Sequence, residues 1–328
     1  MSKIIVNSCS NLNEGCKTLD LAHIFITRKC NLHCKHCYTD SCNSNDSILP
    51  FIFWKRVANQ LRNLKVKHIH VEGGEAFLHP DFDKIISLLI ELKFKNILLV
   101  TNGVLATKER LRLLKVKGLK KIAISLDSLT REINDDLRPG SYEYTVQSIK
   151  HAVELGFHTR ISCCLNRKNI NDVRSFTDAV YNMGVRTLNY DWFVGVGRGN
   201  AVFDEYGITE ADKEILCRFE NDIYDISTNA KYKNFNLCID LPDWYANRNS
   251  FMSNDVYRTR YLDCDAIRKQ VSINEVGNVY PCFIFAYGDK YIGNLNNDFL
   301  VDIIKNANFN CLDCPINAKG HIFYKRSF

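Results

Sequence analysis

Short apolar runs alternate with longer amphipathic stretches from about residue 23 to about residue 226. Runs rich in β-branched and aromatic residues predict six strands, at 23–27, 68–71, 96–101, 121–125, 159–164 and 187–193. Between these runs, apolar residues recur at intervals of three and four, as in Val173, Phe176 and Val180. That period predicts helices with one apolar face each.

Six strands that are each followed by a helix predict parallel strands joined by right-handed crossovers. We therefore expect an α/β fold over residues 22–226, whose sheet closes partly or fully into a TIM-like (β/α)6 barrel. In such barrels the functional side chains lie at the carboxyl ends of the strands. Motifs that carry chemistry are expected at those positions.

Outside residues 22–226 the alternation weakens. Residues 1–21 are expected to form an N-terminal extension, and residues 227–263, which show no clear period, an irregular connection. Within 264–328, the run 271–281 predicts a hairpin with Gly277 and Asn278 in its turn, and a short helix is expected near 298–305. This predicts a small, cysteine-rich C-terminal domain of a hairpin and a helix.

Composition narrows the class of protein. The net charge of +6 comes from Lys and Arg scattered among almost as many acids, without a dense basic stripe, so no nucleic-acid partner is expected. No apolar run approaches the roughly 20 residues of a membrane span, and Met1–Leu21 lacks a signal-peptide pattern. We therefore expect a cytoplasmic protein, in which most of the 14 cysteines are metal ligands or thiols.

Cys30, Cys34 and Cys37 directly follow the first predicted strand. A 4Fe–4S cluster is normally held by four thiolates, so three thiolates without a local fourth leave one iron open to a small molecule. A zinc site is the alternative, because His33 and His36 lie close enough in sequence to complete one.

The segment from Cys30 to Tyr38, CNLHCKHCY, closely resembles the signature of the radical S-adenosylmethionine (SAM) superfamily. The resemblance continues over residues 22–200, with a motif at or beyond the end of each predicted strand. These motifs are Gly73-Gly74-Glu75, Thr101-Asn102-Gly103, Ser125-Leu126-Asp127, Arg138, Asn166 and Gly197-Arg198-Gly199.

The resemblance implies that Cys30, Cys34 and Cys37 hold a 4Fe–4S cluster whose free iron binds SAM. It implies SAM contacts from Gly-Gly-Glu at the amino group, from the segment ending at Asp127 at the ribose, and from Arg138 at the carboxylate. The full set of implied cofactor-binding residues is Tyr38, Gly73, Gly74, Glu75, Thr101, Asn102, Ser125, Asp127, Arg138 and Asn166. The implied reaction is one-electron cleavage of SAM to methionine and a 5′-deoxyadenosyl radical that abstracts hydrogen from the substrate. A flavodoxin or ferredoxin is the implied electron donor.

Four further cysteines, Cys264, Cys282, Cys311 and Cys314, resemble the twitch domain, a shortened SPASM domain of radical SAM enzymes. No cysteine follows Cys314 in the sequence, so the resemblance implies one auxiliary 4Fe–4S cluster. A four-cysteine zinc site is the alternative. A cluster with four thiolate ligands has no free iron, which favours a role as electron acceptor in a net oxidation.

The other cysteines have weaker signals. Cys163, Cys164 and Cys217 are expected to be buried structural residues. Cys238 and Asp240 are candidate catalytic residues in the segment after the barrel, Cys238 as the donor of a returning hydrogen atom and Asp240 as a base. The alternative is that Cys238 only fills space between Leu237 and Ile239.

Enzymes with this pair of domains mostly modify ribosomally made peptides, or oxidise or epimerise sugars and cyclitols. We expect first an oxidative modification, such as a crosslink, of a ribosomally made peptide. A dehydrogenase or epimerase acting on a sugar, cyclitol or aminoglycoside-type molecule is the alternative. A non-catalytic iron–sulfur carrier or scaffold is a third hypothesis, which the implied SAM contacts disfavour.

Overall fold

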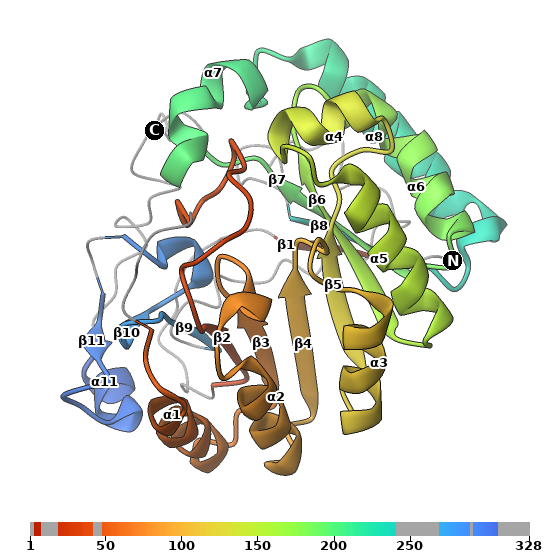
Figure 1. The fold of residues 1–328 in the computed structure, drawn as a ribbon. Helices are drawn as coiled ribbons and strands as arrows, with labels where there is room; N and C mark the ends of the chain where they lie inside the picture. The colour runs from red at the N-terminus through yellow and green to blue at the C-terminus, as the bar shows by residue number, and fades with distance from the viewer. Residues whose placement is uncertain (1–2, 8–18, 42–47, 241–268, 289–290, 308–328) are drawn as a thin grey trace.

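A computed structural model describes residues 3–7, 19–41, 48–240, 269–288 and 291–307. All strands of these residues join one sheet in the order β1-β8-β7-β6-β5-β4-β3-β2-β9-β10-β11 (Figure 1). The strands are β1 Lys3–Asn7, β2 Leu21–Phe25, β3 His68–Glu72, β4 Asn96–Thr101, β5 Lys121–Ser125, β6 His158–Leu165, β7 Thr187–Trp192, β8 Asn236–Asp240, β9 Gln270–Ile273, β10 Asn278–Tyr280 and β11 Gly293–Asn294.

The α-helices of the described residues are α1 Phe51–Asn63, α2 Phe82–Glu91, α3 Lys108–Lys117, α4 Arg131–Leu137, α5 Tyr142–Glu154, α6 Val173–Asn182, α7 Phe203–Tyr206, α8 Lys213–Thr228 and α11 Leu300–Asn306. Short 3-10 helices are η1 Ala76–Leu78, η2 Ile170–Asp172, η3 Gly197–Val202, η4 Ala230–Tyr232 and η5 Phe283–Phe285. Helices α1, α2, α3, α5 and α6 cover the outer face of the curved sheet (Figure 1).

Neighbouring strands from β2 to β8 pair in parallel, as the alternation of strands and helices predicts. Their carboxyl ends therefore lie at one end of the sheet. Residues 26–41, drawn red to orange after β2, and the helices α4 and α7 lie at this end (Figure 1). Side chains of α1 such as Trp54, Val57 and Leu61 are buried, because spacings of three and four place them on one helical face.

The C-terminal hairpin continues the same sheet. Strand β9 pairs in parallel with β2, and β10 pairs antiparallel with β9 and β11. Gly277 has a φ of +85° in the turn between β9 and β10. The Leu300 N–H at the start of α11 donates to Gln60 Oε1 of α1 at 2.7 Å, which ties the C-terminal helix to the barrel.

The six predicted strands, the hairpin and the short C-terminal helix are confirmed, and all their bounds agree with the prediction within two residues. The prediction of an irregular connection over 227–263 was wrong at its start, because α8 runs to Thr228 and β8 occupies Asn236–Asp240. The N-terminal extension likewise contains β1, which pairs with β8. None of the described helices combines the length and apolar character needed to cross a bilayer.

Candidate active site

The three signature cysteines follow β2 on one loop. Cys30 and Cys34 are buried and Cys37 is half-buried. Backbone N–H groups already point at two of the sulfurs: Leu32 N lies 3.4 Å from Cys30 Sγ, and Ser41 N lies 3.4 Å from Cys37 Sγ. Burial raises the pKa of Cys30 to about 12 and also raises the pKa of Cys34. A bound cation would therefore be needed to hold these sulfurs as thiolates at neutral pH.

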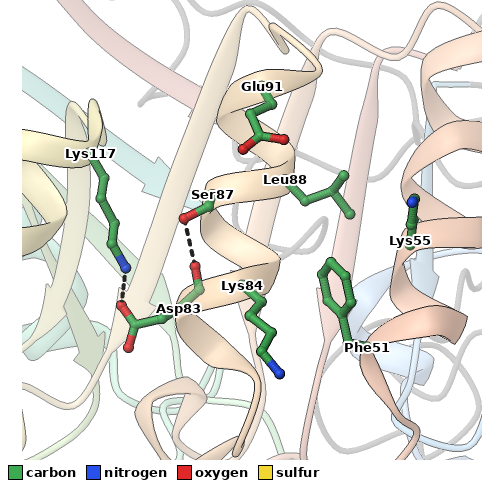
Figure 2. A pocket seen from close by; sticks show the side chains of 8 residues that line it. All are labelled: Phe51, Lys55, Asp83, Lys84, Ser87, Leu88, Glu91 and Lys117. Atoms are coloured by element: carbon green, nitrogen blue, oxygen red, sulfur yellow. Dashed lines mark hydrogen bonds and ion pairs between the residues drawn. The ribbon is translucent and has the colours of Figure 1, made fainter.

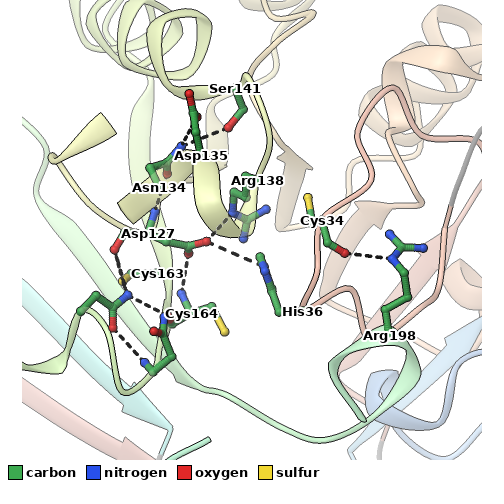
Figure 3. A network of polar contacts seen from close by, with 12 residues as sticks. Cys34, His36, Asp127, Asn134, Asp135, Arg138, Ser141, Cys163, Cys164 and Arg198 are labelled. Carbon is green, nitrogen blue, oxygen red and sulfur yellow. Dashed lines mark hydrogen bonds and ion pairs between the residues drawn. The ribbon is translucent and has the colours of Figure 1, made fainter. Parts of the chain in front are cut away.

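The neighbouring histidines do not join these thiols. His33 is exposed, and His36 Nε2 lies 3.8 Å from Asp127 Oδ2 (Figure 3). Burial lowers the pKa of His36 to about 4, so its ring is neutral and the contact with Asp127 is no ion pair. The donor set at the loop is thus sulfur alone, which fits an iron–sulfur cluster with one open iron better than a Cys–His zinc site.

Gly73 and Gly74 allow the loop after β3 to touch the cysteine loop. A Cβ atom on Gly73 would lie 2.6 Å from the carbonyl oxygen of Thr27. A Cβ atom on Gly74 would lie 2.4 Å from the carbonyl oxygen of Lys29. In their place, Gly74 N donates to Thr27 O and Glu75 N donates to Lys29 O, both at 2.8 Å. The lack of side chains at these two glycines therefore lets the backbone after β3 pack directly against the backbone of Thr27 and Lys29.

Glu75 holds this region together through hydrogen bonds of its buried side chain. Its carboxylate is fully buried and accepts hydrogen bonds from Thr101 Oγ1 and Asn102 N at 2.9 Å, and from Phe77 N at 3.2 Å. Asn102 Nδ2 in turn donates to Asn31 Oδ1 at 2.9 Å and lies 3.8 Å from Cys30 Sγ. Glu75, Thr101 and Asn102 therefore join the ends of β3 and β4 to the cysteine loop.

Arg138 and Asp127 form a buried ion pair at the ends of β5 and α4 (Figure 3). Arg138 Nε donates to Asp127 Oδ2 at 2.6 Å, and Cys164 N donates to Asp127 Oδ1 at 2.8 Å. Burial opposes both charges, but each partner stabilises the other, so the pKa of Asp127 lies below and that of Arg138 above its usual value. Asp127 therefore fixes Arg138, whose terminal nitrogens have no hydrogen-bond partner among the described residues.

Two other residues of the implied SAM site lie nearby with different surroundings. Ser125 ends β5 and is half-buried. Asn166 is fully buried and uses its side chain within its own loop, donating to Cys164 O at 2.8 Å and accepting from Lys168 N at 2.9 Å. This side chain shapes the turn after β6.

Tyr38 lies between the cysteine loop and the C-terminal hairpin. Its hydroxyl donates to Glu72 Oε2 at 3.4 Å, and its ring centroid lies 6.0 Å from that of Phe283. Burial raises the pKa of Tyr38 well above its usual value, so the phenol is neutral. Phe283 directly follows Cys282, so Tyr38 contacts a neighbour of the proposed auxiliary cluster.

Of the four C-terminal cysteines, Cys282 belongs to the described residues. It is half-buried after β10, and Gln270 Nε2 lies 3.6 Å from its sulfur. Cys264, Cys311 and Cys314 lie outside the described residues, so their assignment stays a prediction.

The candidate catalytic pair lies on β8. Cys238 is half-buried and stands opposite Asn189 of β7, whereas Leu237 and Ile239 are fully buried. Alternation along the strand therefore turns Cys238 toward the inner face of the sheet. Asp240 stands opposite Asp191 in the same register.

The three structural cysteines differ from the prediction in part. Cys163 is buried, Cys164 is half-buried and Cys217 is exposed. Cys217 lies on α8 one position after Leu216, which shares the buried face with Phe219 and Ile223, so it falls outside that face.

Arg198 is a residue of the site whose function the sequence did not reveal. Arg198 N donates to Cys37 O at 3.0 Å, and its Nε donates to Cys34 O at 2.9 Å (Figure 3). Gly197 has a φ of +57°, and a Cβ atom there would lie 2.5 Å from the carbonyl oxygens of Cys37 and Tyr38. The Gly197-Arg198 pair marks the position in the sequence, but only the fold shows that it binds the cysteine loop.

A surface groove lies away from this site. It is lined by Phe51, Lys55, Asp83, Lys84, Ser87, Leu88, Glu91 and Lys117 from α1, α2 and α3 (Figure 2). It includes none of the cysteines or implied SAM contacts and lies in the outer helical layer.

Sequence comparisons identify two known families in the chain. The Radical SAM superfamily matches residues 24–180, and an iron–sulfur cluster-binding domain named SPASM matches residues 264–324. Together these families imply a 4Fe–4S cluster, SAM and an auxiliary iron–sulfur cluster as cofactors.

Curated relatives include the antilisterial bacteriocin subtilosin biosynthesis protein AlbA of Bacillus subtilis, 28% identical over 83% of this chain and 56% of its own length. A probable GTP 3′,8-cyclase of Saccharolobus islandicus is 27% identical over 58% of this chain and 62% of its own. The mycofactocin maturase MftC of Mycobacterium tuberculosis is 29% identical over 58% of this chain and 48% of its own. The chain thus spans less than two thirds of each of these relatives.

Solved structures share the fold. Streptococcus suis SuiB bound to the precursor peptide SuiA has a TM-score of 0.70 at 19% identity, covering 94% of this chain and 68% of that one. Native anSMEcpe with bound AdoMet has a TM-score of 0.64 at 15% identity, covering 88% and 81%. From these two matches, the chain carries a radical SAM domain followed by a SPASM-type iron–sulfur domain.

Proposed function

We propose that this chain is an enzyme that reductively cleaves SAM and installs an oxidative modification, such as a crosslink, in a ribosomally made peptide. The observation that carries the proposal is the loop of three buried or half-buried thiols at the carboxyl end of a parallel sheet, beside Arg138. The relatives named for bacteriocin biosynthesis and for mycofactocin maturation support a peptide substrate.

Cys30, Cys34 and Cys37 would hold the cluster, and SAM would meet its open iron. The reduced cluster and SAM would together supply radical chemistry: SAM would accept one electron, methionine would leave, and the 5′-deoxyadenosyl radical would remove a hydrogen atom from the substrate. Cys282, with Cys264, Cys311 and Cys314, would hold the auxiliary cluster. A flavodoxin or ferredoxin in the cytoplasm is the proposed electron donor.

The protein's own contribution is to bind and orient SAM. Because Asp127 occupies Arg138 Nε, the two terminal nitrogens of the guanidinium remain for the SAM carboxylate, a geometry suited to bidentate binding. The backbone around Gly73 and Gly74 would lie against the SAM amino group, where Glu75 fixes its position through Thr101 and Asn102.

Strand β8 carries two further candidates, Cys238 and Asp240. We propose Asp240 as a base for a proton released during oxidation, and Cys238 as a hydrogen donor if the reaction proves to be an epimerisation. Replacing each residue separately and measuring product would assign these roles. Unchanged turnover and product in a variant would remove that residue from the mechanism.

The test uses anaerobically reconstituted protein, dithionite, SAM and a short peptide encoded beside the gene. We expect 5′-deoxyadenosine and a peptide that has lost a pair of hydrogen atoms, both seen by mass spectrometry. The Cys30→Ala variant should form neither product. If wild-type protein forms no 5′-deoxyadenosine, the chain is a carrier or scaffold. If an added aminoglycoside or cyclitol is oxidised and the peptide is not, the small-molecule hypothesis replaces this one.

A further inference from the structure

Three titratable side chains gather on the inner face of β2 and β3, below the cysteine loop. Ala22, Ile24, Ile69 and Val71 of these strands belong to the hydrophobic core. The alternating positions on the two strands therefore face the interior of the barrel, and they include His23, His70 and Glu72. His23 and Glu72 are buried and His70 is half-buried.

The three side chains lie within coordinating reach of one another. Each offers one ligand atom, and these atoms all lie within 4.8 Å of one another. His23 Nδ1 is 2.6 Å from Glu72 Oε1, and His70 Nδ1 is 3.8 Å from the same oxygen. The rings of His23 and His70 meet edge to face at 4.7 Å between centroids.

A hydrogen-bonded pair of His23 and Glu72 accounts for only part of this arrangement. At 3.8 Å, His70 Nδ1 is too far from Glu72 Oε1 for a hydrogen bond. His23 Nε2 is buried without a hydrogen-bond partner among the described residues. Burial lowers the pKa of His70 well below its usual value, so this imidazole is neutral at pH 7, the form that binds metals.

We propose that His23, His70 and Glu72 form a binding site for a divalent transition-metal ion such as Zn²⁺, separate from both iron–sulfur clusters. Two imidazoles and a carboxylate are a common ligand set for zinc and related ions, and they leave a coordination position for water or a substrate atom.

The surroundings fit such a site. Tyr38 O–H lies 3.4 Å from Glu72 Oε2, where it supports the carboxylate as an outer hydrogen-bond donor. Phe283 packs on His23 at 5.1 Å between ring centroids and screens it from one side. The site therefore lies between Tyr38, which follows the cysteine loop, and Phe283, which follows Cys282.

The experiment adds Co²⁺ to anaerobically reconstituted protein whose clusters are kept oxidised, because that state of a 4Fe–4S cluster is diamagnetic and leaves the Co²⁺ EPR signal visible. Zn²⁺ then competes for the same site, and the released Co²⁺ is counted. The variants are His70→Ala and Glu72→Gln, and the second keeps a hydrogen-bond acceptor beside His23. His68→Ala is the matched control, because His68 is half-buried on the same strand and outside the trio.

We expect about one Co²⁺ per wild-type chain, displaced by Zn²⁺, and an affinity lowered more than about tenfold in both trio variants but unchanged in His68→Ala. Equal binding by wild type, His70→Ala and Glu72→Gln would overturn the proposal, as would the lack of any bound ion in wild-type protein with intact clusters. The binding measurement needs no substrate turnover, so its outcome is independent of the proposed peptide modification.

Discussion

A Cβ atom on Gly74 would lie 2.4 Å from the carbonyl oxygen of Lys29 and 2.5 Å from that of Arg28. Both carbonyls are backbone atoms of the segment that leads into Cys30, so they cannot yield as a flexible side chain would. We therefore expect Gly74→Ala to displace the cysteine loop and to lose about four irons per chain from the first cluster. Iron and sulfide analysis after anaerobic reconstitution measures this loss.

Circular dichroism is the control for that variant, because the clash is confined to the loop and the barrel should remain folded. A Gly74→Ala protein with wild-type iron content would show that the two loops separate without cost. In that case the glycine would matter for SAM rather than for the cluster.

Protonation of the single residue His79 should make the free energy of unfolding depend on pH. Asp81 N donates to its Nδ1 at 3.0 Å, and its Nε2 lies 3.2 Å from Leu49 O, so the neutral ring satisfies both contacts. Burial lowers the pKa of His79 below its usual 6.5. Between the two pKa values the unfolded chain binds more protons, so this group lowers the free energy of unfolding as pH falls below about 6.5.

The His79→Asn variant should lack this contribution while it keeps an acceptor near Asp81 N. Urea unfolding at about pH 7.5 and about pH 5.5 should show a smaller loss of stability on acidification in the variant. The loss in free energy of unfolding should differ between wild type and variant by at most about 1.4 kcal/mol for each unit by which folding lowers the pKa of His79. Other buried histidines titrate in both proteins and cancel in this comparison. Parallel pH curves would mean that His79 does not carry the effect.

At the scale of elements, the segment after β7 restrains the loop after β2. Arg198 donates to Cys34 O and to Asp40 Oδ1, at 2.9 Å and 2.8 Å, and its backbone N–H donates to Cys37 O. Hydrogen bonds from a charged donor contribute about 1.5–3 kcal/mol each. We expect Arg198→Ala to loosen the cysteine loop. An iron chelator should then remove the first cluster several times faster from the variant than from the wild type, a rate that absorbance measures.

Arg186→Ala is the matched control, because Arg186 also donates to backbone carbonyls, those of Tyr181 and Val185, on a surface outside the site. Its rate of cluster loss should equal that of the wild type. If both variants lose iron at the wild-type rate, the contacts of Arg198 do not hold the loop.

The sequence predicts the strands that belong to the regular alternation of strands and helices better than it predicts strands outside it. The strands β3 to β7 and the helices between them have repeated apolar positions that one face of a barrel requires. Strand β8 is as short as β3 and β5, but residues 227–263 around it show no clear period that would mark it as a further barrel strand. Its pairing with β7 and β1 depends on partners distant in the chain.

The sequence likewise predicts some features of the candidate site and not others. The spacing of the cysteines and the order of the motifs predict which residues meet at the carboxyl ends of the strands. Sequence does not show that Asp127 turns to Arg138, that Asn166 serves its own turn, or that His23 meets Glu72 across 49 positions. These contacts depend on strand register and on side-chain direction, which only the folded sheet determines.

At the scale of the whole molecule, strand β9 of the SPASM-type domain pairs directly with β2 of the barrel. One sheet therefore runs from the strand before Cys30 into the hairpin that carries Cys282. An auxiliary cluster at Cys282 would be held by the same rigid unit as the first cluster. Such a placement suits a role for the auxiliary cluster as acceptor of an electron from the substrate, because neither cluster would need to move toward the substrate.

The iron content of the chain tests this two-cluster arrangement. We expect about eight irons per wild-type chain, and about four in the Cys30/Cys34/Cys37→Ala variant and in the Cys264/Cys282→Ala variant. The second variant should still cleave SAM but should lose the oxidised product, because the electron then has no acceptor. About four irons in the wild type and almost none in the first variant would assign zinc, or no metal, to the C-terminal cysteines. The oxidation would then have to deliver its electron to another protein, and the pairing of β9 with β2 would have only a structural role.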